Sequence, residues 1–189
     1  MNDAEPELVL ASRSPQRRAI LEQLGIAFRA MAPHAEELVA GEPEALVVEN
    51  ARRKALAVEG RLVLGADTAV VAGGRVHGKP PDDAAARAVL HALSGREHEV
   101  WSGLALRHAG AERTASARTV VRFRALSTAE LDWYVATGEW RERAGGYAIQ
   151  GRGAALVERI EGDFWNVVGL PVPALLGLAP GLILATPPG

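Results

Sequence analysis

The sequence predicts a mixed α/β fold, and three observations support this class. Short apolar runs typical of strands are interspersed with stretches in which apolar residues have helical spacing. Several of the expected strands are joined by tight turns, which makes those pairs antiparallel. The order of strands and helices is therefore not the regular alternation of a doubly wound parallel sheet. The length of 189 residues, without an internal repeat or a low-complexity linker, predicts a single domain over residues 1–189.

The first half of the chain begins with a short strand, a tight loop and a helix. Residues 8–11 are apolar throughout, as expected of a buried strand. Ser14 is a suitable N-cap, Pro15 suits the first helical position, and Gly25 suits the end of the helix. The elements expected next are a helix over residues 44–59, a strand over 61–72 and, after a Gly-Gly turn, a returning strand over 75–77.

The second half is expected to contain two further helices and two hairpins. Asp82 caps an alanine-rich helix that ends at residue 93, while Ser127 and Glu130 have the spacing of a capping box that opens the next helix. The expected hairpins pair residues 97–107 with 112–124, and residues 154–160 with 164–168. Residues 167–185 are uncharged, but prolines and glycines interrupt them, so they predict a strand end, a turn and a buried C-terminal helix rather than a membrane span.

The composition excludes several classes of function. A net charge of −2 gives no general attraction to nucleic acid or to acidic membranes, and we expect neither as a partner. Since the chain has no cysteine, disulfides, zinc–cysteine sites and cysteine nucleophiles are excluded. Residues 1–7 are acidic and lack the basic region of a signal peptide, which predicts a cytoplasmic protein.

The two lysines of the chain are unusual because its other basic residues are all arginine. Of 21 basic residues, only Lys54 and Lys79 are lysine, and Asp67 lies between them in an apolar run. A compact ammonium at these positions, where a wide guanidinium would not fit, predicts a site for a phosphorylated, metal-bound ligand. The alternative is that both lysines are ordinary charges on the surface.

A second candidate site lies where the first helix begins. Arg17 and Arg18 stand in its first turn, where the helix dipole disfavours positive charge. A bound phosphate would reverse that penalty. Free backbone N–H groups, the hydroxyls of Ser12 and Ser14, and Arg17 would hold it. The loop lacks the Gly-Lys-Ser/Thr ending of a P-loop. The alternative is that both arginines point into solvent.

Two acidic positions suggest catalysis and metal binding. Asp67 interrupts an expected strand, and a buried carboxylate needs a partner, which would be a metal, a lysine or a reacting water. A bulge or an edge position open to solvent is the alternative. Glu37 follows the first helix and offers a carboxylate to Mg²⁺ or Mn²⁺, although acidic loop residues are usually just solvated. The histidines have no metal-binding spacing and are expected to be structural or at the surface.

Several short blocks, taken in order, resemble one protein family. They lie at residues 10–17, 54–55, 65–68, 78–82, 93–100, 144–151 and 167–171. Together they resemble the Maf family of nucleoside triphosphate pyrophosphatases. Residues 147–151 look like the branch that prefers dTTP and UTP rather than the branch that acts on 7-methyl-GTP.

The resemblance implies a Maf-like fold related to the inosine triphosphate pyrophosphatases. This is an α/β fold in which helices flank a mixed, strongly curved sheet, with a deep cleft between two lobes. The implied reaction is hydrolysis of a nucleoside triphosphate to the monophosphate and pyrophosphate with a divalent metal cation, Mg²⁺ or Mn²⁺. The resemblance also suggests a homodimer.

The resemblance assigns roles to individual positions. Asp67 matches the catalytic acid, and it is expected to hold the metal together with Glu37. The positions that match phosphate and metal residues are Ser14, Arg17, Glu37, Lys54 and Lys79, and those that match specificity residues are Gln16, Thr68 and Gln150.

One departure from the family pattern concerns nucleotide preference. Gln16 stands where members usually carry arginine, and a neutral amide can pair with a base edge but cannot neutralise phosphate.

Maf-like proteins have also been linked to arrest of cell division. The rival hypothesis is therefore a nucleotide-sensing regulator of division and septum formation with little turnover.

Overall fold

The computed structural model describes residues 8–184, and the chain forms two compact units. Within these residues, the first unit contains residues 8–67, Ser102–Ala117 and residues 169–184, and the second contains Thr68–Trp101 and Arg118–Val168. Residues 1–7, on which the cytoplasmic prediction depends, lie outside the described part, as do residues 185–189, the first of which ends the predicted C-terminal helix region. The expectation of a single domain and that of a cleft between two lobes both stay predictions.

The strands form a mixed sheet, as the sequence predicts. Its order is β2-β1-β3-β5-β6-β7, with β4 paired to β3. β1 pairs in parallel with both β2 and β3, whereas the pairs β3–β4 and β6–β7 are antiparallel. The strands are β1 Leu8–Ala11, β2 Phe28–Met31, β3 Leu62–Ala72, β4 Arg75–His77, β5 Glu97–His108, β6 Ala111–Phe123 and β7 Val157–Glu161.

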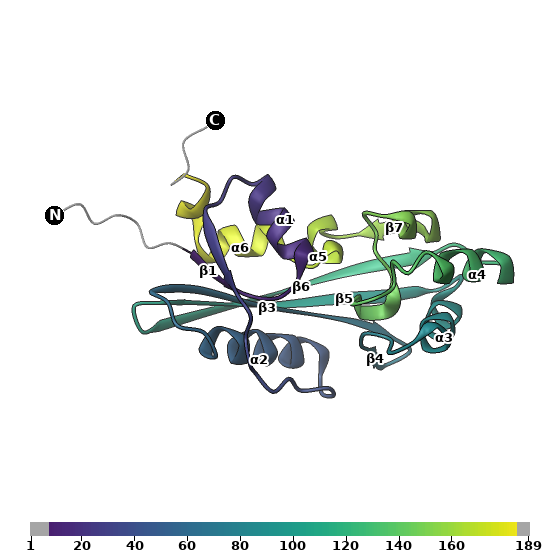
Figure 1. Ribbon diagram of the computed structural model, residues 1–189, viewed down its shortest axis with the longest axis horizontal. Helices are drawn as coiled ribbons and strands as arrows, with labels where there is room; N and C mark the ends of the chain where they lie inside the picture. The colour runs from purple at the N-terminus through teal and green to yellow at the C-terminus, as the bar shows by residue number, and fades with distance from the viewer. Residues whose placement is uncertain (1–7, 185–189) are drawn as a thin grey trace. The chain divides into compact units, whose positions relative to one another are not determined.

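The first unit places helices on both faces of its strands. Figure 1 shows α2 (Pro43–Leu56) on one face and α1 (Pro15–Gln23) with α6 (Val172–Leu178) on the other. α2 lies unusually close to the sheet because two glycines face it. A Cβ added to Gly65 of β3 would lie 2.1 Å from the Ala51 carbonyl oxygen, and one added to Gly103 of β5 would lie 2.3 Å from that of Val47. Side chains on the inner face of α2 therefore reach β3 directly.

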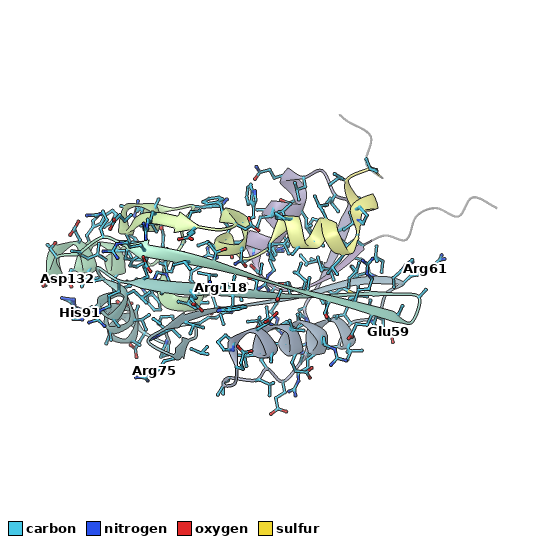
Figure 2. The ribbon with its side chains drawn as sticks, turned by 180° about the vertical axis from the view of Figure 1, so that it is seen from behind. Glu59, Arg61, Arg75, His91, Arg118 and Asp132 are labelled. Atoms are coloured by element: carbon cyan, nitrogen blue, oxygen red, sulfur yellow. The ribbon has the colours of Figure 1, made fainter. Side chains whose placement is uncertain are left out.

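The second unit has its own core around aromatic residues. Phe123, Tyr134, Trp140 and Tyr147 are buried together with leucines of α3 (Asp83–Leu93). Ser127 and Glu130 form the predicted capping box at the start of α4 (Thr128–Ala136). Figure 2 shows the labelled side chains of His91 on α3 and Asp132 on α4, and both are exposed. The 3₁₀ turns of this unit are η1 (Ala144–Gly146) and η2 (Arg152–Leu156).

One predicted hairpin is wrong. Its first half is a strand, but the strand is β7 and it pairs with β6. Its second half is the short helix α5 (Phe164–Val168). The Oδ1 atom of Asp163 accepts a hydrogen bond from the Trp165 N–H at 2.9 Å, and the Thr119 hydroxyl is bonded to both the carbonyl and the N–H of Asp163. These contacts turn the chain into a helix where the sequence suggested a β turn.

The C-terminal apolar stretch contains the predicted turn and helix, but its predicted strand end is the end of helix α5. It turns at Gly169, which has a φ of +128°, and continues as helix α6, which buries Val172, Leu175 and Leu178. The 3₁₀ turn η3 (Pro180–Ile183) follows. Within residues 8–184, none of the helices has the length and apolar character needed to cross a membrane.

Candidate active site

The centre of the candidate site is the carboxylate of Asp67 on β3. It is 9% exposed, and both of its oxygens are bound by residues of α2. Oδ1 lies 2.6 Å from the Lys54 Nζ, and Oδ2 accepts a hydrogen bond from the Asn50 Nδ2 at 3.0 Å. Asp67 lies between the part of β3 that pairs with β1 and the part that pairs with β4, and it is buried there, so the alternative of a position open to solvent is wrong. Of the partners left open by the sequence, the structure contains the lysine.

Lys54 also binds a second carboxylate. Its Nζ lies 2.9 Å from Oε2 of Glu37, which comes from the loop before α2. The Lys54 side chain is only 9% exposed, whereas that of Glu37 is 50% exposed. Lys54 is therefore not an ordinary surface charge: it is an almost buried cation between two carboxylates.

The two carboxylates give a restricted set of metal ligands. Within residues 8–184 there is no cluster of three or more His, Cys, Asp or Glu side chains that could hold a metal ion. Asp67 and Glu37 are hard oxygen donors, and Mg²⁺ is commonly bound by one or two carboxylates together with substrate phosphates. The donor set thus fits a cation that arrives with a phosphorylated ligand better than a permanent metal cage.

Asn50 is a site residue that the sequence analysis missed. Besides its bond to Asp67, its Oδ1 accepts from the Leu38 N–H at 2.7 Å and its Nδ2 donates to the Leu38 carbonyl at 3.0 Å. It is 2% exposed. The available signal was a polar residue one helical turn before Lys54, on the face of α2 that also carries the small residues Ala51 and Ala55.

The loop before α1 is held together by its own serines. The hydroxyl oxygen of Ser14 caps the helix by accepting from the Arg17 N–H at 3.4 Å, as predicted. The hydroxyl oxygen of Ser12 accepts from the Ser14 N–H and from Arg17 Nη1, each at 3.1 Å. The Gln16 amide oxygen accepts from the Ser14 hydroxyl at 3.1 Å, so this side chain folds back on the loop.

Arg17 points into the protein, so the solvent alternative is wrong for this residue. Its Nε donates to the Gly169 carbonyl at 2.9 Å, and it is 8% exposed. Burial lowers the pKa of Arg17 from its ordinary value, and the negative charges of Asp67 and Glu37 act in the opposite direction. The guanidinium thus lies in the field of both carboxylates. Arg18, in contrast, is exposed.

Three of the predicted site residues belong to the second unit. The Lys79 Nζ is paired with Oε2 of Glu142 at 2.7 Å, and both side chains are largely exposed. Gln150 is exposed, and Thr68 follows Asp67 on β3 with its side chain on the opposite face of the sheet. Since Lys79 and Lys54 lie in different units, the prediction that both ammonium groups hold one ligand stays a prediction.

The glycine-rich segment that carries Gln150 is anchored by buried aromatic residues. The Tyr147 hydroxyl lies 2.9 Å from Nε2 of His98, and the Ala148 N–H donates to the Tyr134 hydroxyl at 3.0 Å. Burial, with a smaller effect of His77, lowers the pKa of His98 to about 4, and burial raises the pKa of Tyr147. His98 is therefore a neutral structural histidine, as expected.

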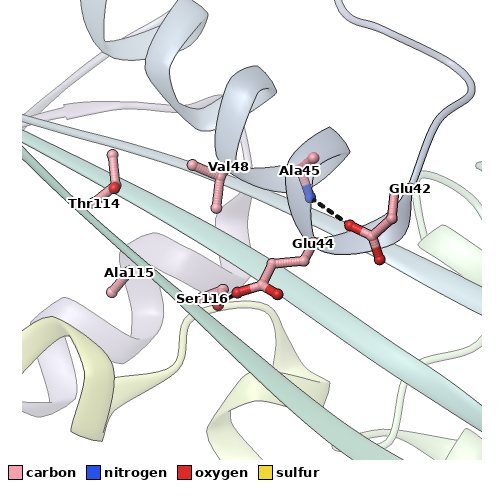
Figure 3. Close-up of a pocket in the computed structure, with 7 residues that line it drawn as sticks. All are labelled: Glu42, Glu44, Ala45, Val48, Thr114, Ala115 and Ser116. Carbon is pink, nitrogen blue, oxygen red and sulfur yellow. Dashed lines mark hydrogen bonds between the residues drawn. The ribbon is translucent and has the colours of Figure 1, made fainter.

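A pocket elsewhere in the first unit contains none of the predicted residues. It has a volume of about 440 Å³ and lies between the start of α2 and β6 (Figure 3). One of its carboxylates, Glu42, caps α2 at the Ala45 N–H, and the other, Glu44, accepts from the Ser116 hydroxyl at 2.5 Å. Among the described residues, its lining contains no lysine, arginine or histidine that could bind a phosphate, so the pocket is not a candidate site for a phosphorylated substrate.

Comparisons with known proteins agree on one family. The family model described as Maf-like protein matches residues 7–180. Curated relatives named dTTP/UTP pyrophosphatase include the following three. That of Symbiobacterium thermophilum is 49% identical over 88% of this chain and 89% of its own length. That of Anaeromyxobacter sp. is 52% identical over 87% and 84%, and that of Thermus thermophilus is 46% identical over 94% and 96%.

A search of solved structures gave a weaker likeness. The structure of the Staphylococcus aureus Ham1 protein matches with a TM-score of 0.45 and 14% identity, covering 62% of this chain and 71% of that one. We base no inference on it.

Proposed function

Because this chain belongs to the family of Maf-like proteins, we propose that it hydrolyses nucleoside triphosphates, dTTP and UTP among them, to the monophosphate and pyrophosphate. The resemblance seen in the sequence is confirmed by the match over residues 7–180. The observation that carries the proposal is the almost buried Asp67 carboxylate, held by Lys54 and Asn50 in the field of Arg17.

In the proposed reaction, Asp67 orients a water and accepts its proton. The water oxygen bonds to the α-phosphorus, the bond from that phosphorus to the bridging oxygen breaks, and pyrophosphate leaves with the electron pair. Arg17, Lys54 and Lys79 hold the negative charge of the triphosphate and of the leaving group. Ser12 and Ser14 would exchange their hydrogen bonds within the loop for bonds to the phosphates when the nucleotide binds.

A divalent cation, Mg²⁺ or Mn²⁺, fits this arrangement. Asp67 and Glu37 would hold it, and when bound it would supply neutralisation of phosphate charge. Lys54 keeps both carboxylates in place before the nucleotide arrives, because it contacts each of them at less than 3 Å.

The direct test is a panel of nucleotides incubated with the purified protein and Mn²⁺, with pyrophosphate as the measured product. Turnover of UTP and dTTP above that of GTP supports the proposal, and tight binding without product supports the rival regulator. Hydrolysis in ¹⁸O-labelled water also identifies which phosphorus the water attacks. The label is expected in the monophosphate, and label in pyrophosphate would refute attack on the α-phosphorus.

We propose that Gln16, Thr68 and Gln150 set the nucleotide preference. Gln16 lies beside the loop of Ser12 and Ser14, where its amide accepts from the Ser14 hydroxyl. Because it carries no charge, it is suited to pair with a base edge rather than with phosphate. Gln16→Arg is expected to change the ratio of kcat/KM for UTP and dTTP, while kcat for the preferred nucleotide stays within a few-fold. An unchanged ratio would remove Gln16 from this role.

Two further parts of the proposal concern the whole molecule. We expect a homodimer, which the mass measured by light scattering in solution tests directly. We also expect the protein to act on the nucleotide pool of the cytoplasm, and fractionation of cells that make it would test this location.

A further inference from the structure

We propose that Asn50 is a positioning residue that fixes the orientation of the Asp67 carboxylate and, through the same side chain, the loop that carries Glu37. This inference rests on the proposed function, because it assumes that Asp67 is the reacting carboxylate. It assigns Asn50 no contact with substrate.

The hydrogen bonds of Asn50 leave little freedom to its side chain. The amide makes three bonds, one through Oδ1 to the Leu38 N–H and two through Nδ2 to the Leu38 carbonyl and to Asp67. A carboxylate and a carbonyl both require a donor, so only the nitrogen can face them. With 2% exposure, the side chain has almost no water to replace a lost partner.

The same contacts close a ring around the site. Asn50 binds the backbone of Leu38, the next residue to Glu37 along the loop, and Glu37 binds Lys54. Lys54 binds Oδ1 of Asp67, and Asn50 binds Oδ2 of the same carboxylate. Since Asn50 and Lys54 are one turn apart on α2, the helix sets the spacing of both carboxylates.

The two partners of Asp67 contribute differently. An ammonium has three donors that rotate freely and attracts a carboxylate without fixing its plane, whereas the planar amide of Asn50 is itself fixed by Leu38. Lys54 therefore supplies charge and Asn50 supplies direction. A carboxylate that turns away from its water loses positional catalysis without losing nucleotide binding.

This difference predicts a particular kinetic pattern. In Asn50→Asp, the residue keeps its size and its acceptor for the Leu38 N–H, but it loses the donor to Asp67 and the donor to the Leu38 carbonyl. We expect kcat for UTP to fall at least about tenfold, while KM changes less than about threefold. In Asn50→Ala the acceptor for the Leu38 N–H is lost as well, so the side chain keeps no bond to the loop. We then expect Mn²⁺ binding without nucleotide, measured by water-proton relaxation, to weaken at least about threefold.

A buried asparagine outside the site provides a matched control. Asn166 of α5 is fully buried, and its Nδ2 donates to the Val100 carbonyl and the Thr119 hydroxyl. Asn166→Asp makes the same change of group at a comparable depth. We expect its kcat and Mn²⁺ affinity to stay within about twofold of the wild type below its melting transition.

The outcomes separate this inference from the proposed function. If the wild type releases no pyrophosphate from any nucleotide, the proposed function fails whatever Asn50 does. If Asp67→Asn keeps its turnover, Asp67 is not the reacting carboxylate and this inference loses its premise. If Asp67→Asn is inactive but Asn50→Asp and Asn50→Ala keep wild-type kcat and Mn²⁺ affinity, the role of Asn50 alone is refuted. If neither Asn50 variant folds, NMR of the wild type decides. A scalar coupling between Asn50 Nδ2 and the Asp67 carboxyl carbon is expected, and its absence overturns the inference.

Discussion

Replacing Lys54 by methionine should destabilise the protein far more than the same replacement at Lys79. Both lysines are paired with carboxylates at similar distances, 2.6 and 2.9 Å for Lys54 and 2.7 Å for Lys79. They differ in burial, because the Lys54 side chain is 9% exposed and that of Lys79 is 61% exposed. The comparison therefore isolates the effect of burial on a lysine–carboxylate pair.

The expected magnitude follows from what each variant leaves behind. Lys54→Met removes the cation from Asp67, whose side chain is 12% exposed, so an almost buried carboxylate loses its ion pair. Breaking a buried pair costs about 3–5 kcal/mol, and we expect about 3 kcal/mol here because Arg17 remains nearby. The pair of Lys79 and Glu142 contributes at most about 1 kcal/mol.

Thermal unfolding followed by circular dichroism at pH 7 tests this comparison. For a chain of this length, about 3 kcal/mol lowers Tm by roughly 6–12 °C. Lys79→Met should lower it by less than about 4 °C. Equal Tm values for the two variants would refute the conclusion that Lys54 is a buried structural cation as well as a site residue.

Three further predictions concern other residues. Lys79→Arg keeps the charge but widens the head group, so kcat/KM for UTP should fall at least about tenfold, and unchanged kinetics would show that charge alone is needed there. Glu142→Gln frees Lys79 from its ion pair and should lower KM by up to about fivefold with kcat unchanged; a higher KM would contradict this. Burial lowers the pKa of His98 to about 4, so the folded state favours the neutral ring. The stability that neutral His98 contributes is therefore complete above pH 6.5 and is lost as the pH falls toward 4. Urea unfolding at several pH values should show that the wild type loses about 3 kcal/mol of unfolding free energy over this range and that His98→Phe does not. Identical pH dependence of the wild type and His98→Phe would refute this role of His98.

The parts of the fold that depend on neighbouring residues could be predicted from the sequence. Ser14 and Asp82 are N-caps because their oxygens reach N–H groups three residues ahead, and such short-range contacts leave a readable pattern. The helix α5 was mistaken for a strand because its start depends on Thr119, more than forty residues away. The edge strand β2 was not expected, since its exposed residues give no apolar alternation.

The site shows the same division between local and distant contacts. The sequence analysis predicted that Asp67 needs a partner, because an aspartate within an apolar strand is costly unless it is paired. That Lys54 and Asn50 are those partners depends on how closely α2 approaches β3, which Gly65 permits. Arg17 is tied to the Gly169 carbonyl, 152 residues away, and no local pattern indicates such a contact.

The turnover of Asp67→Asn tests the central claim most directly. This variant keeps the size of the side chain and removes the carboxylate that lies between Lys54 and Asn50. With UTP and Mn²⁺, release of pyrophosphate should fall at least about a hundredfold in a protein that still unfolds cooperatively. Turnover near that of the wild type would contradict the claim that Asp67 is the reacting carboxylate.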